Sequence, residues 1–288
     1  MSLHIRRLAI VGAGLIGGSL AAALKQAGMV DEVIGLGRRR ETLEQAKALG
    51  LIDGIADNPS QIAGADVVML ATPMAQMQTV LQDIAPHLGA ETIVTDAGST
   101  KADVIAAARK ILGAKFPRFV PGHPIAGAES NGPQAARADL FRGRNVVLCP
   151  VAETDPAALE RVTALWQAAG AQVAQMEAAR HDRIFAAVSH LPHLAAFALV
   201  DDLAARPEAE EFFRFAASGF RDFTRIAGSS PELWRDVALA NREALLAELS
   251  AYMNKLGEIA AALENADAAA LEQIFSRASK ARRSWEVK

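Results

Sequence analysis

The chain has 288 residues, of which 51% are hydrophobic and 22% are charged, and its formal net charge is -3. This length allows two domains with separate cores, and the composition is that of an ordinary globular protein. The weak net charge gives no reason to expect a nucleic-acid partner. The single cysteine, Cys149, excludes an internal disulfide and favours a cytoplasmic location. No run of about 18 residues lacks charged and turn residues, so no membrane-spanning segment is expected.

The first predicted element is a strand at residues 8–11, which is followed directly by glycines in the spacing G-x-G-x-x-G. The first glycine allows a tight turn, the second lets the backbone approach a pyrophosphate, and the third lets the next helix pack on the strand. Free N–H groups at the start of that helix would bind the phosphates. The alternative is a glycine-rich turn that binds nothing. The sequence favours a dinucleotide site, and its predicted contacts are Gly12, Gly14, Leu15, Ile16 and Gly17.

Short apolar runs alternate with alanine-rich helical stretches through the first half of the chain. The predicted strands are residues 8–11, 32–36, 67–70, 92–95, 119–121 and 146–149, and the predicted helices are residues 15–27, 41–49, 76–87 and 100–112. This alternation predicts a Rossmann-type, doubly wound α/β domain with a mostly parallel sheet and helices on both faces. Ligands of such sheets bind beyond the carboxyl ends of the strands, so the residues after each run are the candidates for function.

The second predicted strand is followed by Gly37 and three arginines, Arg38, Arg39 and Arg40. Sites selective for NAD usually carry a carboxylate here that binds the ribose hydroxyls, and a carboxylate would repel a 2′-phosphate. An arginine can bind that phosphate and stack on the adenine. The sequence therefore favours NADP, with NAD as the alternative cofactor. The arginines could also form only a solvated helix start.

Two further turns follow predicted strands. Thr72 and Pro73 come after the third strand, where they either contact the ribose or pyrophosphate or simply connect a strand to a helix. Ser99 follows the fourth strand within DAGSTK, residues 96–101. Its hydroxyl could cap the next helix, orient a catalytic partner, or do both.

A histidine follows the fifth predicted strand. His123 lies between a glycine and a proline, a setting poorly suited to a core histidine. An imidazole titrates near neutral pH, so it can take a proton from an alcohol as hydride leaves the same carbon. No other histidine or lysine occupies an equivalent strand end. We therefore predict that His123 is the acid/base group.

Strand-like runs stop near residue 173, and long helical patterns follow. We place the boundary there, between a dinucleotide-binding domain at residues 1–172 and an all-helical domain at residues 173–288. Residues 241–263 and 268–283 read as amphipathic helices, which commonly associate with a second copy, so we expect a homodimer.

Two features of the helical half could bear on function. His190 and His193 lie three residues apart, but no carboxylate or cysteine spacing supports a metal site, and none is predicted. Arg225 lies in a glycine-flanked segment and is a candidate for binding a substrate carboxylate. The alternative for Arg225 is a solvated helix face.

Several of these segments together resemble the prephenate/arogenate dehydrogenase family of tyrosine biosynthesis over essentially the full chain. The matching segments are VGAGLIGGSL at 11–20, DAGSTK at 96–101, GHPIAGAES at 122–130, SHLPH at 189–193 and GFRDFTRIAGSSPELWRD at 219–236. The resemblance implies the oxidative decarboxylation of prephenate, arogenate or both. Hydride would leave C4 of the cyclohexadienol for the nicotinamide, and the C1 carboxylate would leave as carbon dioxide when the ring becomes aromatic.

The resemblance also implies roles for individual residues. His123 would draw off the proton of the C4 hydroxyl, and Ser99 would orient His123 and the nicotinamide. Arg225 would bind a substrate carboxylate. The remaining implied site residues are His193 along the substrate, Glu129 and Asp222 in an ionic network with Arg225, and Trp234 reaching toward the partner subunit's site.

Gly37 departs from the aspartate of many NAD-using members, so the chain resembles the NADP-using subset. That subset includes arogenate-preferring and dual-specificity enzymes, and the residues do not decide between the two substrates. Direct inhibition by tyrosine at the active site is left open.

Two other functions compete with this interpretation. One is a β-hydroxyacid or 6-phosphogluconate type of dehydrogenase, which relies on a lysine in a glycine-rich helical motif that this chain lacks. The other is a non-catalytic NADP-binding sensor, and the joint presence of Ser99, His123, His193 and Arg225 argues against it.

Overall fold

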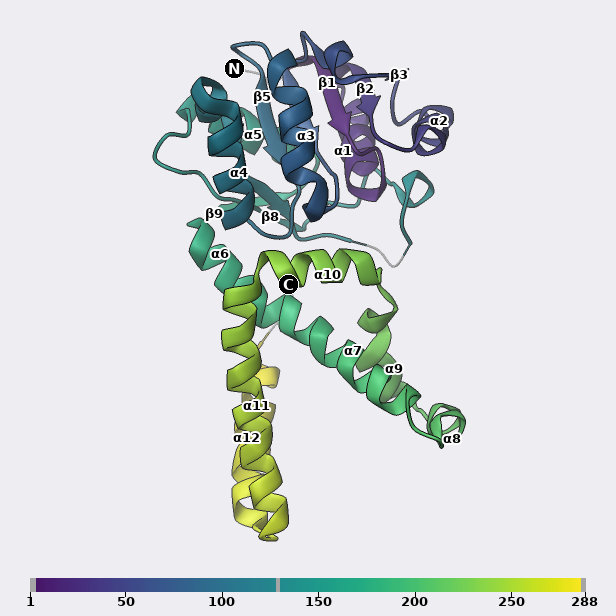
Figure 1. Cartoon of the computed structure of the whole chain (residues 1–288), viewed down its shortest axis with the longest axis vertical. Helices are drawn as coiled ribbons and strands as arrows, with labels where there is room; N and C mark the ends of the chain where they lie inside the picture. Colours follow the sequence, from purple (N-terminus) through teal and green to yellow (C-terminus); the bar gives the residue numbers. More distant parts are fainter. Residues whose placement is uncertain (1–3, 128–129, 286–288) are drawn as a thin grey trace. The chain divides into compact units, whose positions relative to one another are not determined.

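A computed structural model describes residues 4–127 and 130–285 of the chain (Figure 1). The chain divides into two compact units, Met1–Asn241 and Arg242–Lys288. The first unit holds both sheets and helices α1 to α10, and the second holds α11 and α12. The boundary that the sequence predicts, between residues 172 and 173, is a different division and stays a prediction.

A six-stranded parallel sheet forms the centre of the first unit, with strand order β3-β2-β1-β4-β5-β6. The strands are β1 (Ile5–Val11), β2 (Val30–Leu36), β3 (Gly54–Ile55), β4 (Val67–Leu70), β5 (Ile93–Asp96) and β6 (Phe119–Val120). The chain moves outward from β1 to β3 and then returns to the other side of β1 with β4. This doubly wound order confirms the predicted fold class, and its switch point lies between β1 and β4.

Alternate residues of the central strands face opposite layers of helices. In β1, Leu8 and Ile10 belong to one hydrophobic core, and Ala9 and Val11 belong to the other. The first core includes residues of α1 (Leu15–Gln26), α2 (Arg40–Ala48) and α5 (Pro156–Ala168). The second includes residues of α3 (Met77–Ile84) and α4 (Ala102–Leu112), together with Phe185 and Val237 from later helices. Burial on both faces explains why these strands read as continuous apolar runs.

A second sheet has three strands, β7 (Gly122–Pro124), β8 (Asn145–Leu148) and β9 (Gln172–Gln175). Strand β7 is antiparallel to β8, whereas β9 is parallel to it. The run at 146–149 was predicted within the parallel sheet, and that prediction was wrong because β8 pairs outside it. Strand β7 was missed because glycine and proline disfavour strands.

The rest of the first unit is helical. Its helices are α6 (Ala178–Phe185), α7 (Leu191–Ala204), α8 (Ala209–Arg214), α9 (Ser218–Thr224) and α10 (Pro231–Ala240). A π-helical segment, Ala186–His190, joins α6 to α7. Pro192 is the second residue of α7, and its missing N–H removes a regular helical hydrogen bond at this point.

The stretch Ala178–Ala204 is 27 residues long, and its most apolar window has a mean hydropathy of 1.5, which by length and composition alone would suffice to cross a membrane. The buried core helix of a globular protein meets the same test. The expectation that no membrane is involved therefore stays a prediction.

The second unit is a helical hairpin of α11 (Arg242–Glu264) and α12 (Ala268–Ser284), which lie side by side (Figure 1). These helices confirm the amphipathic stretches predicted at 241–263 and 268–283. Large apolar side chains remain exposed on both helices, among them Leu246, Met253, Leu263 and Phe275. Exposed apolar side chains in such numbers are typical of an association surface.

Candidate active site

The glycine loop lies at the carboxyl end of β1. Gly12 has a φ of +97°, and a Cβ on it would lie 2.4 Å from the carbonyl oxygen of Ala71, so this loop touches the turn after β4. A Cβ on Gly17 would lie 2.3 Å from the carbonyl oxygen of Gly12. Both positions therefore require glycine, and α1 packs closely against the loop.

Helix α1 begins without a side-chain cap. Gly14 is its N-cap residue, and nothing lies within 4 Å of the place where a Cβ would be. The N–H groups of Leu15 and Ile16 follow in the first turn, where a helix N-terminus attracts phosphate. Thr72 has a buried hydroxyl without a hydrogen-bond partner among the described residues, and the adjacent Pro73 is exposed. The open space over Gly14 and the unpaired hydroxyl after β4 fit a bound dinucleotide.

The arginines that follow β2 differ in their partners. Gly37, Arg38 and Arg39 are exposed, and within the described part of the chain neither of these arginine side chains is in an ion pair. Arg40 begins α2 and pairs with the carboxylates of Glu44 and Asp57. Arg38 and Arg39 are therefore the arginines whose guanidinium groups can meet an incoming anion.

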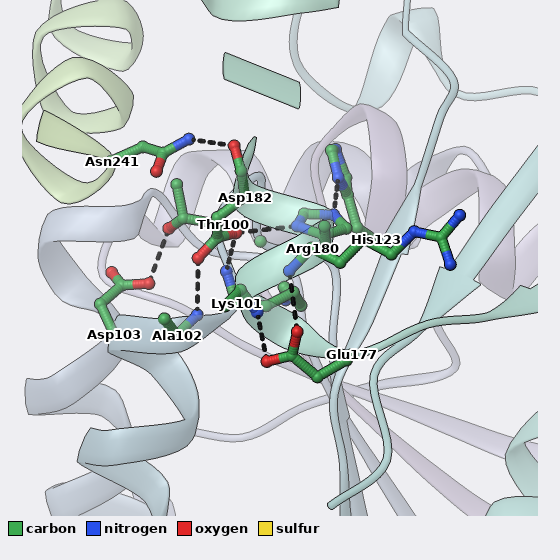
Figure 2. Close-up of polar contacts among 12 residues, drawn as sticks. Thr100, Lys101, Ala102, Asp103, His123, Glu177, Arg180, Asp182 and Asn241 are labelled. Carbon is green, nitrogen blue, oxygen red and sulfur yellow. Dashed lines mark hydrogen bonds and ion pairs between the residues drawn. The ribbon is translucent and has the colours of Figure 1, made fainter. Parts of the chain in front are cut away.

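His123 is the middle residue of β7 and is half-buried. Its Nδ1 lies 2.9 Å from Nε2 of His181, and Nδ1 of His181 lies 2.8 Å from Oδ1 of Asp182. The two carboxylate oxygens of Asp182 accept the backbone N–H groups of Lys101 and Ala102, both at 2.9 Å (Figure 2). One continuous chain of hydrogen bonds thus runs from the start of α4, through α6, to β7.

Burial decides the charge states along this chain. Burial lowers the pKa of His123 well below its usual value, and the neighbouring His181 and Lys101 lower it further. Burial also lowers the pKa of His181, against the opposing effect of its bond to Asp182. Burial opposes ionisation of Asp182, but the His181 ring and the two backbone N–H groups outweigh it and lower the pKa of the carboxyl. At neutral pH both imidazoles are therefore neutral and Asp182 is ionised.

The peptide before His123 is held from both sides. Asp96 and Lys101 form an ion pair whose side chains are both fully buried. Lys101 Nζ donates to the carbonyl oxygen of Gly122 at 2.8 Å, and Asp96 Oδ1 accepts the N–H of Gly122 at 3.0 Å. A Cβ on Gly122 would lie 2.9 Å from the carbonyl oxygen of Asp96, so only glycine allows this approach. The backbone position of His123 is therefore fixed by the fold.

Ser99 lies in the loop between β5 and α4 and is half-buried. The alternative that Ser99 caps α4 is wrong, because the N-cap residue is Lys101 and the carboxylate of Asp182 takes the place of a capping side chain. Among the described residues, the side chain that shares a hydrogen bond with His123 is that of His181. The role of Ser99 in orienting His123 stays a prediction.

The structure brings two of the predicted substrate residues, His193 and Trp234, into contact. The ring of His193 stacks on that of Trp234, with centroids 3.5 Å apart and planes 20° apart. His193 Nδ1 lies 2.9 Å from the carbonyl oxygen of Ser189. Burial lowers the pKa of His193; its bond to Ser189 acts in the opposite direction, and the nearby charge of Arg225 lowers the pKa further.

The other predicted substrate contacts are less defined. Arg225 and Asp222 are both exposed, at the end of α9 and within it. Glu129 lies outside the described residues, so the ionic network of these three side chains stays a prediction. Trp234 packs on His193 of its own chain, and its reach toward a partner subunit also stays a prediction.

Sequence reasoning missed the buried polar residues behind His123. They are Asp96, Lys101, His181, Asp182 and Asn241. Asn241 Nδ2 donates to the carbonyl oxygen of Asp182 at 2.8 Å (Figure 2). The same Nδ2 lies 3.1 Å from Nδ1 of His190. The available signal was a His-Asp pair inside a largely apolar helical stretch, together with the aspartate and lysine that bound the DAGSTK segment.

Two other candidate chemistries find little support in the site. In residues 4–127 and 130–285, no group of three or more His, Cys, Asp or Glu side chains is arranged to hold a metal ion. Cys149 is buried, and burial raises the pKa of its thiol to about 12. A thiol with so high a pKa is a poor nucleophile.

Two family models match the chain. The first is described as prephenate dehydrogenase, nucleotide-binding domain, and matches residues 20–175. The second is described as prephenate dehydrogenase, dimerization domain, and matches residues 177–277. The first match begins after the glycine loop, so the dinucleotide assignment of that loop rests on its geometry.

Individual proteins resemble the chain over nearly its whole length. It is 36% identical to cyclohexadienyl dehydrogenase of Zymomonas mobilis, over 96% of this chain and 95% of that one. The crystal structure of Aquifex aeolicus prephenate dehydrogenase in complex with hydroxyphenyl propionate and NAD+ has a TM-score of 0.91 at 34% identity, covering 98% and 99%. Synechocystis arogenate dehydrogenase has a TM-score of 0.82 at 30% identity, covering 97% and 100%.

Proposed function

The chain belongs to the prephenate dehydrogenase family and is a nicotinamide-dependent dehydrogenase of tyrosine biosynthesis, and we propose that His123 is the base that starts its reaction. The substrate in this proposal is a cyclohexadienol: prephenate, arogenate or both. The observation that carries the proposal is the neutral His123 ring, held on a buried chain of hydrogen bonds. Strands β1, β4 and β5 are adjacent, so their carboxyl ends bring the glycine loop, Thr72 and β7 to one edge of the sheet.

The proposed reaction begins at C4 of the substrate. The bound cofactor supplies the nicotinamide that accepts hydride. His123 takes the proton of the C4 hydroxyl as that hydride leaves the same carbon, and C4 becomes a carbonyl. The C1 carboxylate then leaves as carbon dioxide, and its bonding electrons move into the ring. The resulting phenolate oxygen takes up the proton that His123 holds, so His123 returns to its neutral state.

The substrate would be positioned by the residues around α7, α9 and α10. Arg225 would bind a substrate carboxylate with a charge-assisted hydrogen bond. His193, backed by the stacked Trp234 ring, would lie along the substrate. Ser99 would orient the His123 ring and the nicotinamide, and Asp222 and Glu129 would complete an ionic network with Arg225.

The proposed cofactor is NADP, with weaker use of NAD. Gly37 leaves no carboxylate at the end of β2. The guanidinium groups of Arg38 and Arg39 are exposed there and form no ion pair with residues 4–127 or 130–285. The glycine loop and the first turn of α1 would bind the pyrophosphate. Arg40 is the weakest of the proposed contacts, because two carboxylates already hold it.

The proposed assembly is a homodimer formed through the helical half, residues 173–288, while residues 1–172 bind the cofactor. Within the apolar stretch Ala178–Ala204, only 22% of the most apolar window is buried in the single chain. A second copy could cover this surface and the exposed apolar side chains of α11 and α12. We place the enzyme in the cytoplasm, where the thiol of Cys149 stays reduced.

Tyrosine is a proposed inhibitor, because it shares the amino acid side chain of arogenate and the aromatic ring of the product. It would compete with substrate for Arg225. Initial rates measured at increasing tyrosine concentrations should then show a raised KM for the cyclohexadienol and an unchanged kcat. A lowered kcat at saturating substrate would contradict competition at this site.

Steady-state kinetics with prephenate and arogenate, each paired with NAD+ and NADP+, test the proposed function. We expect turnover of at least one cyclohexadienol and a higher kcat/KM with NADP+. Activity with a β-hydroxyacid and with neither cyclohexadienol would favour the competing dehydrogenase type. Binding of NADP+ by calorimetry without any turnover would favour a sensor.

A further inference from the structure

We propose that His181 and Asp182 are positioning residues that set the tautomer of His123, so that its outward nitrogen is the unprotonated one. This inference rests on the proposed role of His123 as the base. It concerns which nitrogen of the His123 ring carries the hydrogen. Asp182, at the other end of the chain of hydrogen bonds, determines this.

The chain of hydrogen bonds begins at the carboxylate of Asp182, which can only accept hydrogen bonds. Asp182 is ionised, and an ionised carboxylate has no hydrogen to donate. Its oxygens accept the N–H groups of Lys101 and Ala102, which point out of the start of α4. The 2.8 Å contact between Asp182 Oδ1 and His181 Nδ1 is therefore a hydrogen bond in which His181 Nδ1–H donates.

The direction of this bond determines the next one. A neutral imidazole has one N–H, so His181 with its hydrogen on Nδ1 has a lone pair on Nε2. That lone pair faces Nδ1 of His123 at 2.9 Å, so His123 must donate through Nδ1–H. A neutral His123 then carries its only lone pair on Nε2. This is the atom that a general base needs when it takes the proton of an alcohol.

The surroundings hold the two rings in this arrangement. Phe185 packs against both, with ring centroids 4.9 Å from His123 and 4.5 Å from His181. Asn241 anchors the backbone of Asp182 through its carbonyl oxygen. The ion pair of Lys101 and Asp96 holds the peptide before His123. The rings therefore have little freedom to turn over and exchange their nitrogens.

The same chain of hydrogen bonds stabilises the positive charge that His123 gains in the reaction. When His123 takes up a proton it becomes a cation in a buried site that already contains the Lys101 ammonium. The Asp96 carboxylate is paired with that ammonium. The negative charge of Asp182, on the far side of His181, is therefore the one that stabilises the new cation through the intervening ring.

A purely structural alternative is that Asp182 only caps α4. The variant Asp182→Asn separates the two roles, because a carboxamide can still accept an N–H from the α4 terminus through its oxygen. With its oxygen on the N–H of Ala102, its NH2 group takes the place of Oδ1 and donates to His181 Nδ1, which puts the His181 hydrogen onto Nε2. His123 would then accept at Nδ1 and carry its hydrogen on Nε2, where it can no longer act as a base.

The test is a nitrogen NMR measurement of His123 in the full-length protein with ¹⁵N-labelled histidine and bound NADP+. The chain has six histidines, and a His123→Asn variant identifies the signals of His123. We expect the Nδ1–H tautomer in the wild-type protein and the Nε2–H tautomer in Asp182→Asn. The wild-type measurement needs no variant of Asp182, so it decides the proposal even if Asp182→Asn does not fold.

Kinetics of the same variant give the second readout. By analogy with the loss of the carboxylate in a serine-protease triad, kcat should fall by about 10²- to 10⁴-fold, while the Kd for NADP+ stays unchanged. Asp103→Asn is the matched control, because Asp103 is also at the start of α4 but bonds to Thr100 and not to His181. It should keep the wild-type kcat and tautomer.

Two results would overturn the proposal. One is a wild-type His123 with its hydrogen on Nε2. The other is an Asp182→Asn variant that keeps the wild-type kcat, or that loses activity only through KM with the tautomer unchanged. A wild-type protein that has the expected tautomer but oxidises neither cyclohexadienol would instead refute the proposed function.

Discussion

The residues behind His123 and the residues proposed to recognise ligand charges are built in different ways. Asp96, Lys101 and His181 are fully buried, and their hydrogen-bond partners belong to the same chain. Arg38 and Arg225 are exposed, at the ends of a strand and of a helix. Folding alone can therefore set the geometry of the reacting group, whereas the binding groups lie where solvent and a charged ligand can reach them.

This difference has an energetic reason. A buried polar group without a partner costs about 1–3 kcal/mol of stability, so each buried polar group behind His123 needs a hydrogen-bond partner. An exposed guanidinium stays largely solvated, so its ion pairs contribute only about 0–1 kcal/mol to stability. Substitutions in the buried region should therefore change kcat or stability, and substitutions in the exposed region should change KM or Kd.

The largest expected effect is that of His123→Asn. The variant removes the base, so kcat should fall by about 10²- to 10⁴-fold, while the Kd for NADP+ measured by calorimetry stays close to wild type. His4→Asn is the control, because His4 is exposed and pairs with Asp31. A His123→Asn variant with near-normal kcat would remove His123 from the proposed mechanism.

Arg225→Gln tests the exposed residues that are proposed to bind ligand charges. Losing a charge-assisted hydrogen bond costs about 1.5–3 kcal/mol, so KM for the cyclohexadienol should rise by about 10- to 150-fold with kcat little changed. Arg221→Gln on the same short helix, with an exposed arginine, should leave KM unchanged. A lowered kcat at unchanged KM would instead place Arg225 in the chemical step.

His190 should make the buried region sensitive to acid. Burial lowers the pKa of His190 to about 4, below the value of 6.5 expected in the unfolded chain. The unfolded state therefore binds a proton first, and stability is lost as the pH falls from 6.5 toward 4. At pH 5 this group should reduce the free energy of unfolding by about 2 kcal/mol.

Denaturant unfolding at pH 7.5 and pH 5 measures this loss. His123, His181 and His193 have lowered pKa values as well and act in the same direction, so the comparison is with a variant. His190→Gln should lose less stability than the wild type over this interval, whereas His4→Gln should match the wild type. Identical losses in wild type and His190→Gln would contradict the assignment.

The smallest expected effect concerns the cofactor. Replacing Arg38 and Arg39 by alanine should weaken NADP+ binding by about 2- to 30-fold, since exposed ion pairs contribute about 0.2–1 kcal/mol each and two are lost with the 2′-phosphate contact. NAD+ binding should barely change. Arg109→Ala is the control, because Arg109 is exposed, pairs with Glu153 and is not a proposed cofactor contact. Equal weakening of both cofactors would refute the 2′-phosphate contact.

The sequence predicted features that depend on local patterns. The glycine spacing, the apolar runs of β1, β2, β4 and β5, and the amphipathic helices α11 and α12 all depend on residues close together in the chain. The isolation of His123 between a glycine and a proline was also visible in the sequence. The fold class followed from the alternation of these elements.

The features that the sequence did not predict depend on long-range pairing. His181 lies 58 residues after His123, and the hydrogen bonds from Lys101 and Ala102 to Asp182 join positions 81 and 80 residues apart. A buried His-Asp pair looks like any polar interruption of a helix until the helix is placed against α4. Strand β7 was missed because it forms by pairing with β8, not by its own propensity.

A single-turnover experiment with NADP+ already bound tests most directly whether His123 links oxidation to decarboxylation. NADPH formation and carbon dioxide release are followed in the same sample after mixing with excess cyclohexadienol. The wild-type protein should form NADPH and carbon dioxide in a 1:1 ratio, and His123→Asn should lose both together. NADPH formation without carbon dioxide, or carbon dioxide release that persists in His123→Asn, would contradict the proposed mechanism.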